Sequence, residues 1–344
     1  MRAWAGRWGW LIPIFLVISL FLNILGLILP FLEIDEAFHS KVTYSLPHSV
    51  HLMWEHKLYL VAVLILGFSI IFPFIKLASL FAAWFISWKT SSRATFLHWI
   101  ELLGKWSYMD IFVVILLLSL TSQQSFISST IHIGVYFFIG AITLSMVLSQ
   151  IVLTMARKMI ALESPPSAYS TKRIWMLTNK LYVGWTVPIL TILAAGALVE
   201  SLHAPFLRIS QFLLVSRTYS ISEIAAVMKS NQHIVLLIIM LGTLAFVPLL
   251  RLFILLVTWM SPMKIEYHIR VKKLLEGLSR WSMLDVFGLS LFLVATEGKD
   301  LIKTEILPGL RIVVVAIAIS YLLGLVAVSL HKAMVNDDSA TEAS

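Results

Sequence analysis

The stretch GKWSYMDIF, residues 104–112, carries an aspartate into an apolar segment, and LSRWSMLDVF, residues 278–287, does the same later in the chain. Both copies read Trp-Ser-x-x-Asp, followed by a β-branched residue and Phe. A carboxylate inside an apolar segment is costly unless it is paired or meets water, so such residues usually mark a functional site. The repetition therefore indicates that one polar arrangement is built twice.

The composition is that of a membrane protein. Of 344 residues, 59% are hydrophobic and 13% are charged, and the mean hydropathy is +0.92. Soluble domains are closer to half apolar and a quarter charged. The absence of cysteine excludes disulfides, Cys-ligated zinc, iron–sulfur clusters and thiol catalysis. Because no nucleophile–base set or nucleotide-binding motif is found, we expect neither enzymatic activity nor a cofactor.

The apolar residues form eight blocks, which we interpret as transmembrane helices. The predicted spans are 9–32, 57–87, 107–121, 132–156, 181–203, 233–259, 282–296 and 308–331. The third and seventh are short for a crossing, and a re-entrant pair is the alternative for them. The Trp-Ser motifs would then open these two spans, each preceded by an interfacial amphipathic helix that carries Glu101 or Glu276.

The basic residues set the orientation of these spans. Of the 26 Lys and Arg residues, sixteen lie on the side of the two termini and seven on the other side; Lys76, Arg251 and Arg311 lie within spans. The positive-inside rule then places both termini in the cytoplasm, for a multi-pass protein of the bacterial inner (plasma) membrane. The net charge of +8 follows from this topology and from lipid contact, so no nucleic-acid partner is expected.

The chain aligns with itself when it is shifted by 175 residues, as from Pro30 to Pro205. Matched residues of types that rarely align by chance are Tyr44 with Tyr219, Pro73 with Pro248, Trp106 with Trp281, Ser107 with Ser282, Asp110 with Asp285, Gly134 with Gly309, and Ser145 with Ser320. Each copy holds four spans, an even number, so both copies point the same way. We predict an all-α integral membrane protein with eight transmembrane helices in two tandem parallel four-helix repeats. The predicted parts are a first unit at 1–160, a cytoplasmic linker at 161–175, a second unit at 176–335 and a polar tail at 336–344.

Two pairs of charged residues recur within the spans. Lys76 follows Pro73 by three residues, and Arg251 follows Pro248 in the same way. If Trp84 and Trp106 lie at the interface, Lys76 is about 12 Å deep and Asp110 about 6 Å deep by helical rise. A lysine stem spans that difference, so we predict that Lys76 pairs with Asp110 and that Arg251 pairs with Asp285.

These pairs have two readings, which the sequence leaves open. They are either structural clips between helices or the lining of a polar cavity for a charged headgroup or a proton. The candidate polar network consists of Lys76, Asp110, Arg251, Asp285, Ser107 and Ser282, and the candidate structural positions are Pro73, Pro248, Trp106 and Trp281. The prolines kink their helices, either to open space beside the charge or simply for packing.

The remaining polar residues have simpler interpretations. Arg311 has no charged counterpart in the first copy and lies where its side chain can reach the interface. His51 and Glu55 lie one helical turn apart in a histidine-rich outer loop, but the spacing matches no metal motif, so a solvated polar loop is expected and no metal site. Within this loop SVHLMWEH, residues 49–56, could form a short interfacial helix.

The order of motifs resembles a known family. A Pro-x-x-Lys/Arg helix followed by [KR]-W-S-x-x-D-[IV]-F, present twice, is similar to the paraquat-inducible protein A family, which includes PqiA and LetA. The resemblance covers residues 9–331. Many members also carry Cys-x-x-Cys zinc ribbons; this chain, without cysteine, would be a member lacking them.

The resemblance implies a function that composition and spacing do not. It implies an inner-membrane component of an intermembrane phospholipid transport system, which works with a periplasmic MCE-domain protein and with membrane phospholipids. Two alternatives stay open: an ion- or proton-coupled transporter of a small solute that uses Asp110 and Asp285, and a non-transporting membrane anchor of an envelope complex.

Overall fold

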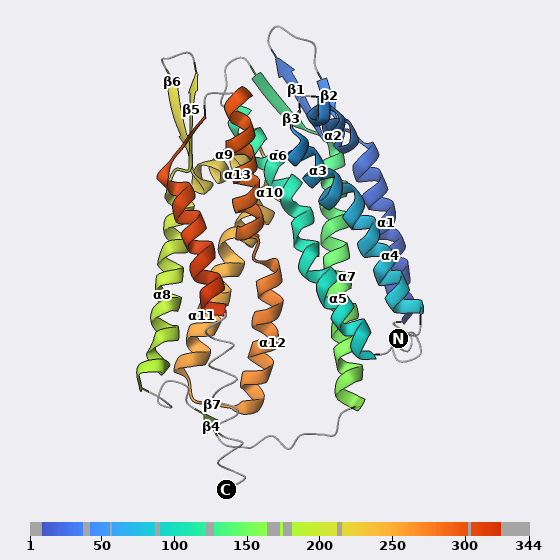
Figure 1. Cartoon of the computed structure of the whole chain (residues 1–344), viewed down its shortest axis with the longest axis vertical. Helices are drawn as coiled ribbons and strands as arrows, with labels where there is room; N and C mark the ends of the chain where they lie inside the picture. The colour runs from blue at the N-terminus through green and yellow to red at the C-terminus, as the bar shows by residue number, and fades with distance from the viewer. Residues whose placement is uncertain are drawn as a thin grey trace. The chain divides into compact units, whose positions relative to one another are not determined.

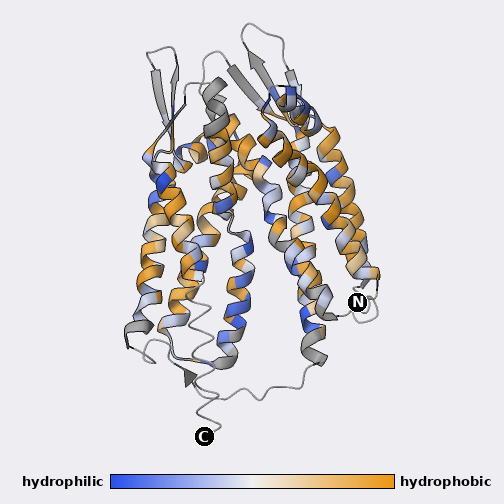
Figure 2. Cartoon of the chain, in the orientation of Figure 1, coloured by the Kyte–Doolittle hydropathy of each residue, from blue (hydrophilic) through white to orange (hydrophobic). Residues whose placement is uncertain are grey.

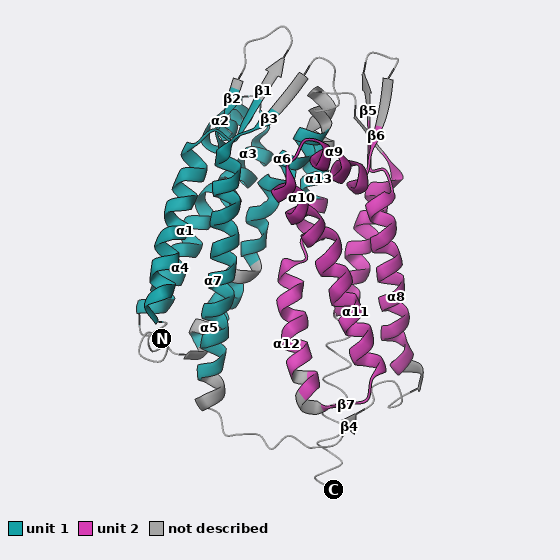
Figure 3. Cartoon of the chain, turned by 180° about the vertical axis from the view of Figure 1, so that it is seen from behind, with its two compact units in different colours: residues 1–166, 289–297 teal, residues 167–288, 298–344 magenta. Residues whose placement is uncertain are grey.

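The computed structural model forms two compact units (Figure 3). Unit 1 contains residues 1–166 and 289–297, and unit 2 contains residues 167–288 and 298–344. The structure describes residues 9–36, 42–55, 57–86, 90–121, 127–163, 173–174, 181–211, 215–301 and 304–324. Most of the predicted linker and the whole predicted polar tail lie outside these ranges.

Unit 1 is a bundle of long helices with a small β-sheet at one end (Figure 1). In chain order its main elements are α1 (Leu11–Ile28), β1 (Leu32–Glu36), β2 (Val42–Tyr44), α2 (Leu46–Glu55), α3 (Tyr59–Ile65), α4 (Phe72–Phe85), α5 (Thr90–Gly104), α6 (Met109–Thr121), β3 (Ile127–Ile131) and α7 (Ile133–Glu163). The strands form an antiparallel sheet in the order β2-β1-β3.

Unit 2 has the same order of elements. They are α8 (Leu181–His203), β5 (Leu207–Gln211), β6 (Val215–Tyr219), α9 (Ile221–Ser230), α10 (Ile234–Leu241), α11 (Val247–Met260), α12 (Ile265–Trp281), α13 (Leu284–Leu301), β8 (Thr304–Ile306) and the helix Pro308–Gly324. Residues 289–297 of α13 belong to unit 1, and the two ends of this helix belong to unit 2. Its sheet has the order β6-β5-β8, and the short strands β4 (Arg173–Ile174) and β7 (Met263–Lys264) pair at the other end of the unit.

The sheets replace part of the predicted outer loops. In unit 1 the residues that alternate in β1, such as Leu32 and Glu33, follow the period of a half-buried strand, which the sequence interpretation overlooked. Leu32 is buried against the bundle while Glu33 reaches His132, with 2.9 Å between Oε2 and Nε2. The segment that follows is helical as α2, in agreement with the short helix expected there.

A close backbone contact in each unit, between a helix-starting glycine and a proline carbonyl, explains several of the repeated residues. Gly134 at the start of α7 donates its N–H to Pro30 O at 3.2 Å, and Gly309 donates to Pro205 O at 3.1 Å. A Cβ atom on Gly134 would lie 2.5 Å from that carbonyl oxygen, and one on Gly309 would lie 2.2 Å from its counterpart. The backbone approaches so closely at both places that only glycine fits.

Seven helical segments in the described residues are long and apolar enough to cross a membrane. They are Leu11–Ile28, Tyr59–Phe85, Thr95–Ser119, Ile133–Met159, Gly184–His203, Ile234–Met260 and Arg270–Val294. The eighth predicted span is described only as far as Gly324, as a shorter apolar helix. Apolar residues cover most of these helices, whereas hydrophilic residues dominate α12 (Figure 2).

Two predicted starts are wrong, because the third and seventh segments begin at Thr95 and Arg270 instead of 107 and 282. In unit 1, α5 packs into the bundle rather than lying at its surface: Leu97 is 1% exposed and Ile100 is 7% exposed. The predicted interfacial helix is therefore the first half of the third segment.

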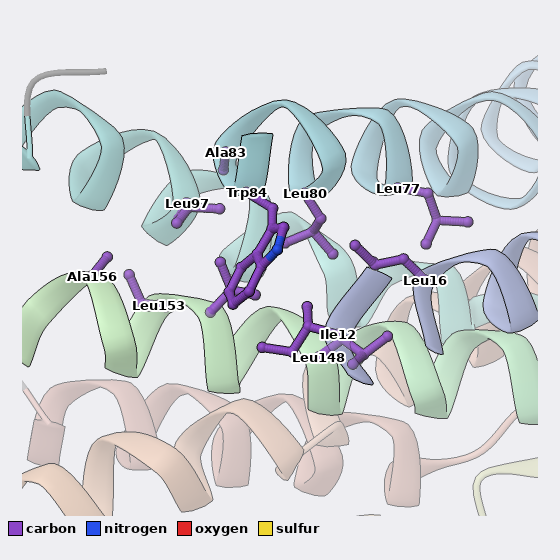
Figure 4. Close-up of a cluster of buried hydrophobic side chains, with 11 residues drawn as sticks. Ile12, Leu16, Leu77, Leu80, Ala83, Trp84, Leu97, Leu148, Leu153 and Ala156 are labelled. Atoms are coloured by element: carbon purple, nitrogen blue, oxygen red, sulfur yellow. The ribbon is translucent and has the colours of Figure 1, made fainter. Parts of the chain in front are cut away.

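The core of unit 1 lies where α1, α4, α5 and α7 meet (Figure 4). Trp84, expected at the membrane interface, is instead 2% exposed at its centre. It is surrounded by Ile12, Leu16, Leu77, Leu80, Ala83, Leu97, Leu148, Val152, Leu153 and Ala156. This packing holds the inner face of α4, and with it Lys76, in one orientation.

We predict that Gly309→Ala lowers the thermal stability of the purified protein. The added methyl group must push apart backbone atoms, and overpacking of this kind costs about 1–3 kcal/mol. Gly242→Ala is the matched control, because no atom lies within 4 Å of the Cβ that it would add. Thermal unfolding in mild detergent measures the effect, and an equal loss of stability in both variants would contradict the close backbone contact at Gly309.

Candidate functional site

A helix irregularity lies just before each repeated proline. Residues Leu66–Ile71 and Gly242–Phe246 are π-helical, so Phe72 donates its N–H to Gly67 O and Val247 donates to Gly242 O, five residues back. Continuing this pattern would require an N–H group at Pro73 and Pro248. Proline has none, so the carbonyls of Phe68 and Thr243 lose their helical donors.

The Trp-Ser motifs supply the missing donors. Ser107 Oγ donates to Phe68 O at 3.0 Å in unit 1. In unit 2 the donor to Thr243 O is the backbone N–H of Met283, at 3.3 Å. Serine and backbone thus perform the same task at neighbouring positions of the two copies, and each motif is joined to the proline-bearing helix of its own unit.

Each motif also interrupts its helix near the middle. In unit 1 a 3-10 turn at Lys105–Tyr108 separates α5 from α6. In unit 2 the non-helical residues Ser282 and Met283 separate α12 from α13. By helical rise, Asp110 lies within about 5 Å of the midpoint of the segment Thr95–Ser119. The motif, predicted at the start of its span, thus lies near the middle of this candidate segment.

Lys76 is buried beside this interruption. Its side chain is 2% exposed, and Nζ donates to Ser145 Oγ of α7 at 3.1 Å. Nζ also lies 2.8 Å from the position that a Cβ atom on Gly104 would take. Gly104 therefore provides the space for the ammonium group where α5 ends. The sequence analysis named neither Ser145 nor Gly104 as a site residue.

Asp110 lies in the same interior on the first turn of α6. It is 3% exposed, and within the described residues neither of its carboxylate oxygens has a hydrogen-bond partner. The hydroxyl group of Ser69, on the π-helical segment, is also buried and lies beside Asp110, but the two groups form no hydrogen bond. The predicted direct pairing of Lys76 with Asp110 is wrong, because the lysine head group turns towards α7.

The equivalent residues of unit 2 are more accessible. Arg251 and Asp285 are half-buried, and Tyr321 is 58% exposed. The Tyr321 hydroxyl donates to Asp285 Oδ2 at 3.4 Å, and this tyrosine is also within electrostatic range of Arg251. Arg251 and Asp285 thus both interact with Tyr321, in place of the predicted direct pair.

The other predicted positions have structural roles. Trp106 packs against Phe68, with ring centroids 6.1 Å apart, and Lys105 Nζ lies 5.9 Å from the Trp106 ring centroid. Trp281 and Ser282 are half-buried at the end of α12. Pro73 and Pro248 are buried within the first turn of α4 and α11.

The residues considered for metal binding lie outside this interior. His51 Nε2 is 3.2 Å from Glu55 Oε1, and both side chains are exposed. Within the ranges that the structure describes, no group of three or more His, Cys, Asp or Glu residues could hold a metal ion.

We predict that Ser107→Ala destabilises unit 1 more than Ser282→Ala destabilises unit 2. Removing the Ser107 hydroxyl leaves Phe68 O buried without its donor, which costs about 1–3 kcal/mol. Thr243 O keeps the Met283 N–H in the second variant. Thermal unfolding of both variants measures the difference, and similar values for the two would refute the role of Ser107.

Comparison with known proteins identifies the family. The family model described as paraquat-inducible protein A matches the chain twice, over residues 12–155 and 186–333. No match was found among curated proteins or among solved structures. The two matched regions include the motif residues of both units and most of the chain, and the protein therefore belongs to the paraquat-inducible protein A family.

Proposed function

We propose that this protein is an inner-membrane component of an intermembrane phospholipid transport system and works with a periplasmic MCE-domain partner. In this proposal the chain crosses the membrane eight times, as two tandem parallel four-helix units with both termini in the cytoplasm. It acts as a transport protein without enzymatic activity of its own.

One observation carries the proposal: charged and hydroxyl groups are held at the middle of long apolar helices in both units. Lys76 and Asp110 are 2% and 3% exposed, and Arg251 and Asp285 are half-buried at the equivalent places. Residues of this kind are expensive in a membrane and are retained where a polar group passes or binds. Family membership supports the same reading.

The unit 2 residues suit the headgroup of a phospholipid. A guanidinium group presents a fork of donors that matches a phosphate, and Arg251 is accessible enough to meet one. The guanidinium group lies close to Gly324: the position of an added Cβ atom there would be 3.5 Å from an Arg251 guanidinium nitrogen. The acyl chains would lie along apolar side chains of the same unit, of which Phe253 is 63% exposed.

The first test is purification from the native host in mild detergent, with identification of bound lipids and proteins by mass spectrometry. We expect an enriched phospholipid and an MCE-domain protein. A bulk-composition lipid sample without a partner would contradict the proposal and favour the solute transporter. A partner protein without enriched lipid would favour the membrane anchor.

We further predict that Arg251→Gln lowers the amount of phospholipid bound per protein by about tenfold or more. Hydrogen bonds to a charged group contribute about 1.5–3 kcal/mol, and the variant removes the charge but keeps most of the volume. Arg311→Gln is the matched control, because Arg311 is an exposed arginine on the helix Pro308–Gly324. Quantitative lipid analysis of the two purified variants measures the effect, and equal retention of lipid would refute a headgroup site at Arg251.

A further inference from the structure

The two equivalent aspartates have different surroundings. Asp285 is half-buried and receives hydrogen bonds from the Tyr321 hydroxyl at 3.4 Å and from the Val286 N–H at 3.0 Å. Asp110 is 3% exposed and, within the described residues, receives none. Donors stabilise the ionised form of a carboxyl group, and burial without donors opposes it.

The start of the following helix explains part of this difference. In unit 2 the chain leaves helical geometry at Ser282 and Met283, so α13 starts anew at Leu284 and offers the positive end of its dipole to Asp285. In unit 1 the 3-10 turn runs directly into α6, and the Met109 N–H is already bonded to Trp106 O. Asp110 therefore lacks the helix end that supports its counterpart.

The ionisable side chains near Asp110 contact other groups. On α4, Lys76 Nζ donates to Ser145. On the 3-10 turn, Lys105 lies over the Trp106 ring, and the Tyr108 hydroxyl shares a 2.6 Å hydrogen bond with Thr143 of α7. The π-helical segment contributes only Ser69, whose hydroxyl is buried beside Asp110 and is itself without a partner in the described residues.

Substitution within the repeat supports a special role for this pair. The position equivalent to Ser69 in unit 2 is Leu244, which is fully buried. The position equivalent to Tyr321 in unit 1 is Met146, which is 2% exposed. The aspartate of unit 1 thus lies beside a buried hydroxyl group, whereas that of unit 2 accepts a hydrogen bond from an exposed phenol.

We propose that Asp110 and Ser69 form an exchangeable proton site in unit 1. The Asp110 carboxyl group holds the proton in the closed interior, where an ionised carboxylate without donors is strongly disfavoured. On release, its O–H bond breaks, the electron pair stays on the carboxylate oxygen, and the proton passes to a water molecule admitted beside Ser69. The Ser69 hydroxyl then donates to the carboxylate, and uptake of a proton from water reverses the step.

Infrared spectroscopy of the full chain in lipid nanodiscs tests this site directly. At neutral pH we expect a carbonyl stretching band of a protonated carboxylic acid, which disappears in Asp110→Asn and remains in Asp285→Asn. Raising the pH should remove the band reversibly in the wild-type protein. Ser69→Ala should keep the band but move it, because the neighbouring hydroxyl is lost.

Three outcomes would overturn the proposal. They are the absence of the band in folded wild-type protein, a band that persists in Asp110→Asn, and loss of the band when sodium is added at constant pH, which would mean that sodium replaces the proton. If the Asp110→Asn variant does not fold, the band of the wild-type protein and its loss at raised pH still test the proposal. A hydrophobic carbodiimide, which reacts with protonated carboxyl groups, should label Asp110 at neutral pH and leave Asp285 unlabelled. Labelling of Asp285 alone would refute the assignment.

This site goes beyond the proposed function and does not depend on it. It would supply a coupling ion to whichever substrate the protein moves. Infrared and labelling results report only on the carboxyl group, whereas bound lipid and the MCE-domain partner are measured separately. A protein with a protonated Asp110 but no enriched phospholipid would therefore keep this inference and reject the lipid proposal.

Discussion

The arrangement of both units depends on one constraint: a proline within an apolar helix leaves a carbonyl group that must find another donor. Water satisfies such a group at a protein surface, but an apolar interior offers none. Ser107 serves Phe68 in unit 1, and the Met283 N–H serves Thr243 in unit 2. Because the donor must arrive from a neighbouring helix at its middle, that helix is interrupted there. The interruption in turn positions Asp110 and Asp285 on the first turn of the next helix.

This constraint explains why the sequence predicts some features well. Proline and glycine recur at one offset because each meets a backbone requirement that other residues do not meet. Gly134 and Gly309 admit a carbonyl at distances that a side chain would forbid. The apolar blocks predict where most helices lie because membrane crossing requires length and hydropathy. The family was likewise apparent from its motifs.

Other features depend on tertiary contacts that leave little trace in a single sequence. The strands β1 and β5 are five residues long and polar on one side, so they resemble loops. The direction of the Lys76 side chain depends on the space at Gly104 and on Ser145, from separate helices. Ser145 was detectable as a repeated residue, matched by Ser320, but its hydrogen bond with Lys76 was not. The polar sequence of α5 suggested an interfacial helix, although its Leu97 and Ile100 pack in the core.

The two units share one order of elements but differ in the side chains around it. The proline, the π-helical segment and the interrupted helix recur in both units, because the interrupted helix supplies the donor that the proline removes. Side chains around this frame are free to differ, as Ser69 and Leu244 or Met146 and Tyr321 do. A closed interior disfavours charge and suits a proton, whereas an accessible arginine suits an anionic headgroup. Under the two proposals, unit 1 would hold a proton at Asp110 and unit 2 would hold a headgroup at Arg251, and this division depends on the differences between the two units.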